Sequence, residues 1–123
     1  KTKDIDALFE HPSSQSTIAG LAGDNDADLR MIFQLVDAMF ERAARLVVCC
    51  YVACQRCAGT GSHPLHPVLI TVEGTTYYRC EALKRKIDYY IEHYMTRRCG
   101  LYVQTARVED AVTYGTALAA VCR

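Results

Sequence analysis

The sequence predicts an α+β domain in which a long N-terminal helix and further helices pack on a small sheet. Residues 27–58 contain no glycine or proline and carry apolar side chains three or four positions apart, as in a helix. Residues 68–72 and 75–79 are mostly β-branched and aromatic, which favours strands. Residues 81–100 return to helical spacing, so helices and strands are mixed within a chain of 123 residues, a length typical of one domain.

The segment before the long helix is expected to be a short helix and a loop. Residues 3–11 place apolar side chains on one helical face and are followed by Pro12, whereas residues 12–26 are mainly small and polar. Because the chain begins with Lys1 rather than Met, we expect it to be processed or excised from a longer protein.

A continuous helix over residues 27–58 would be longer than the domain that carries it. It would be about 45–48 Å long, whereas a compact domain of this size is about 35 Å across. The helix would either protrude and meet a partner or break near Arg45, which would turn residues 46–53 into a buried strand or irregular segment. Residues 39–57 contain no glycine, proline, asparagine or aspartate, which favours the continuous helix, and Gly59 is suited to cap it.

The strands at residues 68–72 and 75–79 are expected to form a β-hairpin, because the Glu-Gly pair between them suits a tight turn. The remaining elements are expected to be a helix, a strand and a helix over residues 81–100, 101–106 and 107–123. This order gives a small sheet with helices packed on one side.

The charged residues are balanced in number but unevenly placed. Basic and acidic residues number 14 each, so the formal net charge is zero and a strongly basic nucleic-acid module is not expected. Residues 1–45 hold eight acids and five bases, whereas residues 46–123 hold six acids and nine bases, an asymmetry that can direct docking. The longest uncharged apolar run, residues 46–54, is far too short to span a membrane.

Seven cysteines are a high and odd number for a chain of this length. A secreted disulfide scaffold more often has an even set, and a bridge between the adjacent Cys49 and Cys50 would be strained. We therefore expect an intracellular protein of a reducing compartment, cytoplasm or nucleus, with free or metal-bound thiols. Disulfides in an oxidising compartment are the alternative.

One cysteine pair has the spacing of a metal site. Cys54 and Cys57 are separated by two residues, and two thiolates at this spacing can bind one zinc ion. The stretch CQRCAGTG that contains them resembles one CxxCxGxG module of the DnaJ-type zinc fingers, over eight residues. Cys80 is a candidate third ligand and His63, His66 or Cys99 a fourth, so one structural zinc is a candidate cofactor.

The alternative is that these cysteines belong to the apolar core and bind nothing. Cys50, Cys54 and Cys57 continue the spacing of the preceding apolar side chains, and free cysteine is commonly buried. On this interpretation Cys50 and Cys54 face the core, and replacing either of them by serine destabilises the fold.

A basic segment beside tyrosines is a candidate nucleic-acid surface, because single strands bind to basic side chains and aromatic rings. Its residues are Lys84, Arg85, Lys86, Arg97 and Arg98. A solvated helix face is the alternative, since arginines near the end of a helix interact favourably with its dipole. We therefore expect this surface to contribute little to nucleic-acid affinity.

No phosphate-binding glycine loop, paired-carboxylate signature or Ser/His/Asp motif is recognisable in the sequence. The sequence therefore predicts a non-enzymatic interaction or oligomerisation domain that binds a protein partner or a second copy through its long helix. The candidate interface residues are Leu29, Ile32, Phe33, Val36 and Phe40. The alternative is a zinc-stabilised nucleic-acid-binding or regulatory module, and a thiol-dependent enzyme or redox sensor is a third hypothesis.

Overall fold

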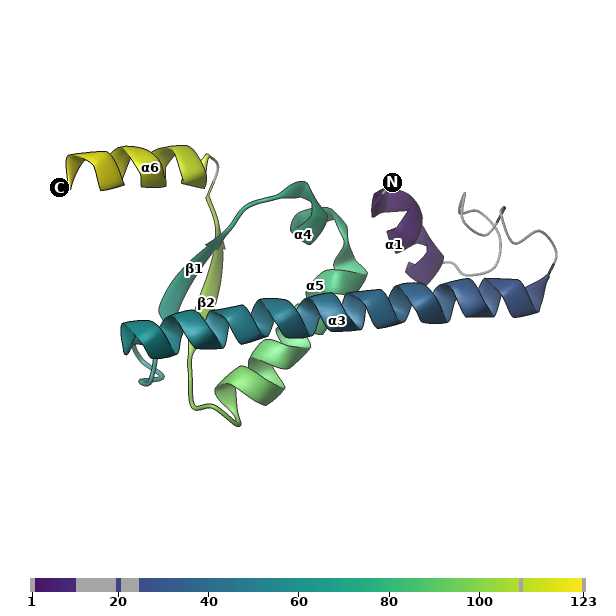
Figure 1. Ribbon diagram of the computed structural model, residues 1–123, viewed down its shortest axis with the longest axis horizontal. Coiled ribbons are helices and arrows are strands. Elements are labelled where there is room, and N and C mark those ends of the chain that lie inside the picture. Colours follow the sequence, from purple (N-terminus) through teal and green to yellow (C-terminus); the bar gives the residue numbers. More distant parts are fainter. Residues whose placement is uncertain (1, 11–19, 21–24, 109, 123) are drawn as a thin grey trace.

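A computed structural model describes residues 2–10, 20, 25–108 and 110–122 of the chain. Its elements in chain order are α1 (Thr2–Glu10), α3 (Asp26–Ala58), β1 (Val68–Val72), α4 (Thr75–Arg79), α5 (Glu81–Tyr90), η1 (Ile91–Thr96), β2 (Val103–Arg107) and α6 (Ala111–Val121). Figure 1 shows α3 running along the molecule, with α1 beside its N-terminal half and the two strands crossing near its C-terminal half. The predicted α+β class is confirmed, and the predicted loop at 12–26 lies largely outside the described residues.

The long helix is continuous, as the sequence predicted. It has 33 residues and is therefore about 50 Å long. The side chain of Asn25 accepts a hydrogen bond from the amide of Ala27 at 3.0 Å and so caps the first turn. Gly59 ends the helix in the left-handed conformation, at φ 64°. None of the described helices is long and apolar enough to cross a membrane.

The predicted β-hairpin is wrong, because the second of its strands is the helix α4. β1 pairs instead with β2, in parallel, from Val68 opposite Val103 to Val72 opposite Arg107. A parallel pair requires a long crossover connection, and α4 is the first part of that crossover. Residues 75–79 form a helix despite their β-branched and aromatic composition, because packing with the rest of the chain decides which segments become strands.

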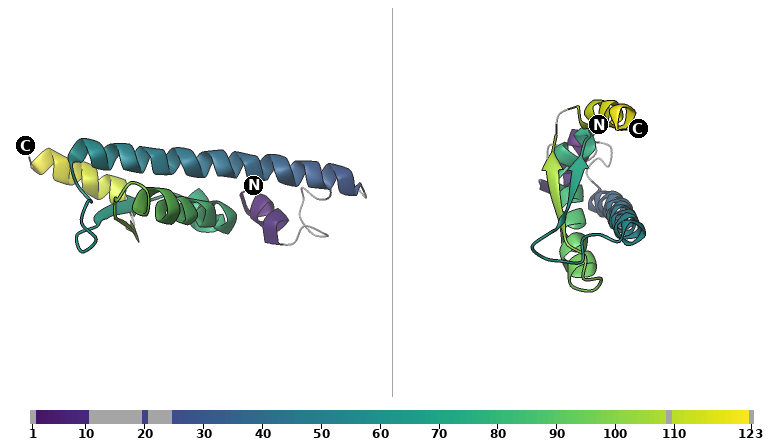
Figure 2. Two further views of the ribbon diagram at one scale, coloured as in Figure 1. Left: turned by 90° about the horizontal axis from the view of Figure 1, so that it is seen from below. Right: turned by 90° about the vertical axis from the view of Figure 1, so that its left-hand side faces the viewer.

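The crossover packs α5 and η1 against α3, and this contact holds the core. The buried core residues are Ala44, Val48, Val52, Ile87, Met95 and Leu101. The two views of Figure 2 place α1, α5 and the strands all on one side of α3. The fully buried side chain of Ala44 is small, which lets the backbone of α5 approach α3 closely.

The end of the second predicted helix is a π-helical segment, η1. Its backbone bonds reach five residues back, as from the amide of Arg97 to the carbonyl of Glu92 at 3.1 Å. The wider turn changes which side chains face the core. Met95 is therefore fully buried, whereas the neighbouring Tyr94 is 37% exposed.

The predicted burial of Cys50 and Cys54 is also wrong, because both side chains are exposed. Residues 46–54 are apolar on every side, so periodicity could not choose the face on which α5 packs. The buried face includes the polar Gln55, whose amide donates to the carbonyl of Tyr102 at 3.3 Å. α6 contains no buried residue at all within its described length.

α1 lies across α3 and α5 near the N-terminal half of α3. The ring of Phe9 lies 4.7 Å from that of Phe33 and 5.5 Å from that of Phe40, measured between centroids. Asp6 accepts a hydrogen bond from the amide of Ala82 at 3.2 Å, which ties α1 to the first turn of α5.

A network around Glu41 joins α3 to α5 outside the core. Arg45 bonds to one oxygen of Glu41 at 2.8 Å, and Lys86 bonds to the other at 3.3 Å and to Asp37 at 2.9 Å. The hydroxyl of Tyr90 also donates to Glu41. The bond from Tyr90, followed by that from Arg45, lowers the pKa of Glu41 from 4.5 to about 2.

We expect Met95→Ala to lower the free energy of unfolding by about 2–5 kcal/mol, because it leaves a cavity between η1 and α3. Leu65→Ala is the matched control, since this side chain is 80% exposed and its truncation should change stability by less than about 0.5 kcal/mol. Urea unfolding of the three proteins measures both values. Equal losses for the two variants would show that η1 does not pack as described.

We expect Glu41→Gln to destabilise the chain by about 1 kcal/mol at pH 7, because the network is partly exposed. The pKa of Glu41 is lower in the folded state, so its charge stabilises the fold above pH 4.5, and this contribution is lost as the pH falls toward 2. The difference between wild type and variant should therefore shrink between pH 5 and about 3. Thermal unfolding across this range is the measurement.

Glu92→Gln is the control for the network, because Glu92 forms a more exposed pair with Arg97 at 3.0 Å. It should change stability little at any pH. A Glu41→Gln deficit that stays constant down to pH 3 would contradict a stabilising role for the charge.

Candidate functional site

A pocket of about 560 Å³ opens where the two parallel strands end. The last register pair, Val72 with Arg107, brings the carboxyl ends of β1 and β2 to one edge of the sheet. The segments that follow the strands complete the walls. The lining residues are Val72, Glu73, Gly74, Tyr78, Arg79, Arg107, Val108 and Asp110. Parallel sheets commonly bind ligands outside the carboxyl ends of their strands.

Tyr78 fixes one wall of the pocket. Its hydroxyl donates to the carbonyl of Val72 at 2.8 Å, so the ring is held against the end of β1. The guanidinium of Arg107 lies 4.9 Å from the centroid of this ring, a cation–π distance. The ring therefore positions the charge of Arg107 at the edge of the pocket.

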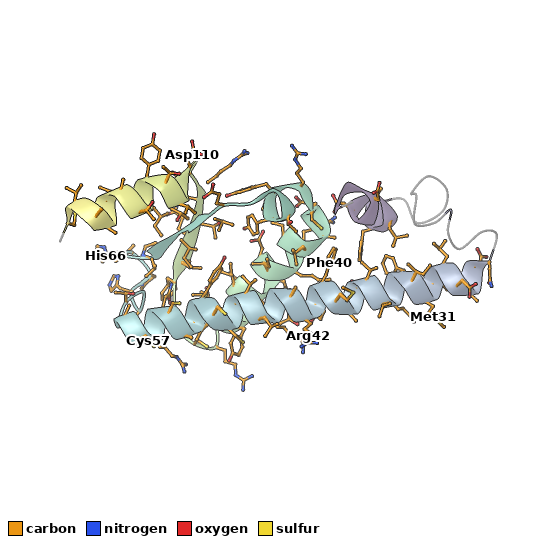
Figure 3. All side chains as sticks on the ribbon, turned by 45° about the horizontal axis from the view of Figure 1, so that its top comes forward. Met31, Phe40, Arg42, Cys57, His66 and Asp110 are labelled. Carbon is orange, nitrogen blue, oxygen red and sulfur yellow. The ribbon has the colours of Figure 1, made fainter. Side chains whose placement is uncertain are left out.

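The opposite wall is formed by the turn after β1 and the start of α6. Gly74 has φ 125°, a backbone conformation that residues other than glycine rarely adopt. The chain can therefore turn sharply away from β1 here. The carboxylate of Glu73 accepts a hydrogen bond from the amide of Val112 at 3.3 Å, in the first turn of α6. Asp110 precedes α6 in the left-handed conformation and lies at the start of that helix in Figure 3.

The pocket is lined by both basic and acidic side chains, which suits an anion that binds together with a cation. Arg79 and Arg107 are exposed and can bind phosphate oxygens, as guanidinium groups do. Glu73 and Asp110 supply carboxylate oxygens, the ligand type that Mg²⁺ prefers. One or two such carboxylates together with ligand phosphates are the usual environment of Mg²⁺.

The structure does not assemble the zinc site predicted from the cysteines and histidines. Cys54 and Cys57 are exposed on the last turns of α3, and the rings of His63 and His66 lie 5.2 Å apart in the following loop. Figure 3 places Cys57 and His66 at the same end of the molecule. Among the described residues, no group of three or more His, Cys, Asp or Glu side chains could hold a metal ion.

Cys80 lies apart from the other zinc candidates. It directly precedes α5, which starts beside α1 about midway along α3, whereas Cys54 and Cys57 lie on the last turns of α3 (Figure 1). Its side chain is buried, and this burial raises the pKa of the thiol. A buried thiol of raised pKa is a poor metal ligand and a poor nucleophile.

The candidate nucleic-acid residues are divided between internal contacts and solvent. Lys86 binds Asp37 and Glu41, and Arg97 binds Glu92. Lys84 is half-buried, whereas Arg85 and Arg98 are exposed. The low nucleic-acid affinity expected of this surface stays a prediction.

The candidate interface residues all lie partly buried on α3. Phe33 and Phe40 contact Phe9, so α1 covers part of their face within the chain. Leu29 and Phe33 also line a cavity of about 340 Å³ together with Leu8. Ile32 and Val36 are half-buried.

The comparison with known protein families identifies the family of this chain. The family model described as Hexokinase matches residues 2–122, nearly the whole chain. The chain therefore belongs to the hexokinase family. No curated protein and no solved structure matches it.

This match overturns the function predicted from the sequence. A non-enzymatic interaction or oligomerisation domain is wrong, since the family is one of enzymes. The alternative, a zinc-stabilised nucleic-acid-binding or regulatory module, is not supported either, because the family match and the scattered cysteines both oppose it.

Reasoning from the sequence missed the pocket because its residues come from two distant segments. The lining residues between Val72 and Arg79 meet Arg107, Val108 and Asp110 because the strands pair in parallel. In the predicted hairpin, residues 73–74 would have formed a tight turn, and nothing in that arrangement would have placed Arg107 next to them. The glycine after a β-branched run was the available signal, and it was interpreted as a hairpin turn.

We expect Cys54 and Cys57 to be alkylated by iodoacetamide in the native protein at nearly the rate of the unfolded chain, since both are exposed. Cys80 should react on the order of 100-fold more slowly, because it becomes accessible only when the structure opens. Peptide mapping by mass spectrometry measures each site. Added chelator should leave all three rates unchanged, and acceleration at Cys54 would restore the metal hypothesis.

Proposed function

We propose that this chain acts in the phosphorylation of a sugar and that the pocket at the ends of β1 and β2 receives the phosphates of the nucleotide donor. The match of residues 2–122 to the hexokinase family is the observation that carries this proposal. The position and charge of the pocket support it, because phosphoryl transfer depends on positioning and on cationic groups around the phosphates.

Arg107 and Arg79 are the residues proposed to bind the phosphates. Arg107 ends β2 and is oriented by the ring of Tyr78, so its charge faces the pocket without large loss of side-chain freedom. Arg79 ends α4 on the neighbouring wall. Two guanidinium groups on separate elements can hold a polyphosphate from two sides.

Mg²⁺ is the cofactor that this chemistry implies, and the pocket fits it in donor type. Glu73 and Asp110 would hold the ion together with the phosphates, since the described residues offer no larger group of ligands. The bound ion would neutralise charge that develops on the phosphates during transfer. The protein side chains orient the donor and keep its phosphates at the end of the sheet.

The compartment is a separate proposal that rests on the thiols. All seven cysteines are free, and five of them are exposed. Exposed thiols persist in the reducing cytoplasm and are oxidised in secretory compartments. A cytoplasmic location is therefore proposed, and localisation of a tagged full-length protein tests it.

We expect Arg107→Ala and Arg79→Ala each to weaken MgATP binding roughly 10- to 100-fold, as the loss of a charge-assisted hydrogen bond to phosphate does. Arg98→Ala is the control, because this arginine is exposed on a segment that does not line the pocket. Isothermal titration with MgATP gives the affinities, and ADP release with glucose and other hexoses tests the transfer.

Circular dichroism of each variant separates loss of binding from loss of fold. MgATP binding that is unchanged in both pocket variants would remove the donor from this pocket. Absence of ATP-dependent sugar phosphorylation by the full protein would overturn the proposed activity itself.

A further inference from the structure

α3 has a second apolar face, which the rest of the described chain leaves uncovered. Its large side chains are Met31, Leu35, Met39 and Leu46, with exposed fractions of 69%, 64%, 63% and 57%. They recur at spacings that put them on one side of a helix, together with Ala38, Cys49 and Ala53. Figure 3 shows Met31 and Arg42 on the side of α3 away from Phe40, which faces α1.

The charges along α3 are distributed so that the helix is complementary in charge to a second copy that runs antiparallel to it. Residues 26–41 contain four acids and one base, whereas residues 42–58 contain three bases and no acid. A parallel neighbour would bring acids against acids. An antiparallel copy brings the acidic half of each helix against the basic half of the other.

The side chains on the exposed face also match in size under this reversal. With Arg42 at the twofold axis, Met31 lies opposite Ala53 of the second copy and Leu35 opposite Cys49. Leu46 lies opposite Ala38 in the same register, so three of the four large side chains meet a small one, and Met39 lies opposite the side chain of Arg45. At the ends of the interface, the carboxylate of Asp28 meets the guanidinium of Arg56.

We infer that two copies of this chain associate through this face of α3, antiparallel and centred on Arg42. The face follows nearly all of a 33-residue helix, and a standard stable interface needs about 800 Å² from each partner. The core residues of α3 and the pocket at the sheet end lie on other faces, so association leaves both unchanged. The two Arg42 side chains at the axis repel each other and limit the strength of the dimer.

Sedimentation velocity of the full chain over a concentration series tests this inference. The wild type should show a concentration-dependent dimer, and Leu35→Arg should raise its dissociation constant roughly tenfold or more. Leu118→Arg is the matched control, because Leu118 on α6 is also 64% exposed and apolar but lies outside the interface. Arg42→Leu should strengthen the dimer by removing the repulsion at the axis.

The antiparallel arrangement is tested by exchanging the end charges. Asp28→Arg and Arg56→Asp should each weaken the dimer, and the double variant should restore it, since each arginine then meets an aspartate again. Circular dichroism and thermal unfolding verify that every variant is folded. A chain that stays monomeric at high concentration, including as Arg42→Leu, overturns the inference.

A dimer that responds to Leu118→Arg but not to Leu35→Arg would place the contact on α6 and also overturns it. A dimer sensitive to Leu35→Arg whose double charge variant stays weak would exclude the antiparallel register. Nucleotide binding by the variants should be unaffected, because none of the substituted residues lines the proposed pocket, so the result is independent of that pocket.

Discussion

The parallel pairing of β1 with β2 is the constraint on which the rest of the structure depends. Two parallel strands cannot be joined by a tight turn, so residues 73–102 must leave the end of β1 and return to the start of β2. The returning chain forms α4, α5 and η1, and α5 covers the inner face of α3. The same pairing aligns the two carboxyl ends, which creates the pocket.

The start of this pairing is held by a compact contact at the C-terminal end of α3. The amide of Tyr102 donates to the carbonyl of Gly61 at 2.7 Å, and the amide of Val68 donates to the carbonyl of Tyr102 at 3.0 Å. A β-carbon on Gly61 would lie 2.7 Å from Gln55 and 3.1 Å from the carbonyl of Tyr102, so only glycine fits here. Gln55, Gly61 and Tyr102 thus fix where β2 begins relative to α3.

Local signals in the sequence predicted the elements better than their partners. The absence of breakers from 27 to 58 and the cap at Gly59 identified α3, because they act within the helix itself. The partner of β1 is decided by packing at long range, and residues 75–79 have a composition that suits either state. The buried face of α3 was predicted wrongly for the same reason. Residues 46–54 of this helix are apolar on every side, and only the position of α5 decides which of them are buried.

The candidate site depends on contacts between residues that lie even further apart in the sequence. Glu73 and Val112 are 39 positions apart, yet their contact closes one wall of the pocket and anchors the first turn of α6. α6 has no buried side chain, so this contact and the end of β2 determine how it leaves the sheet. The amide of Val112 at the start of α6 already binds the Glu73 carboxylate, and Glu73 also lines the pocket. A ligand that bound the Glu73 carboxylate in the pocket would therefore act on the group that orients α6, which follows from the geometry at the ends of β1 and β2.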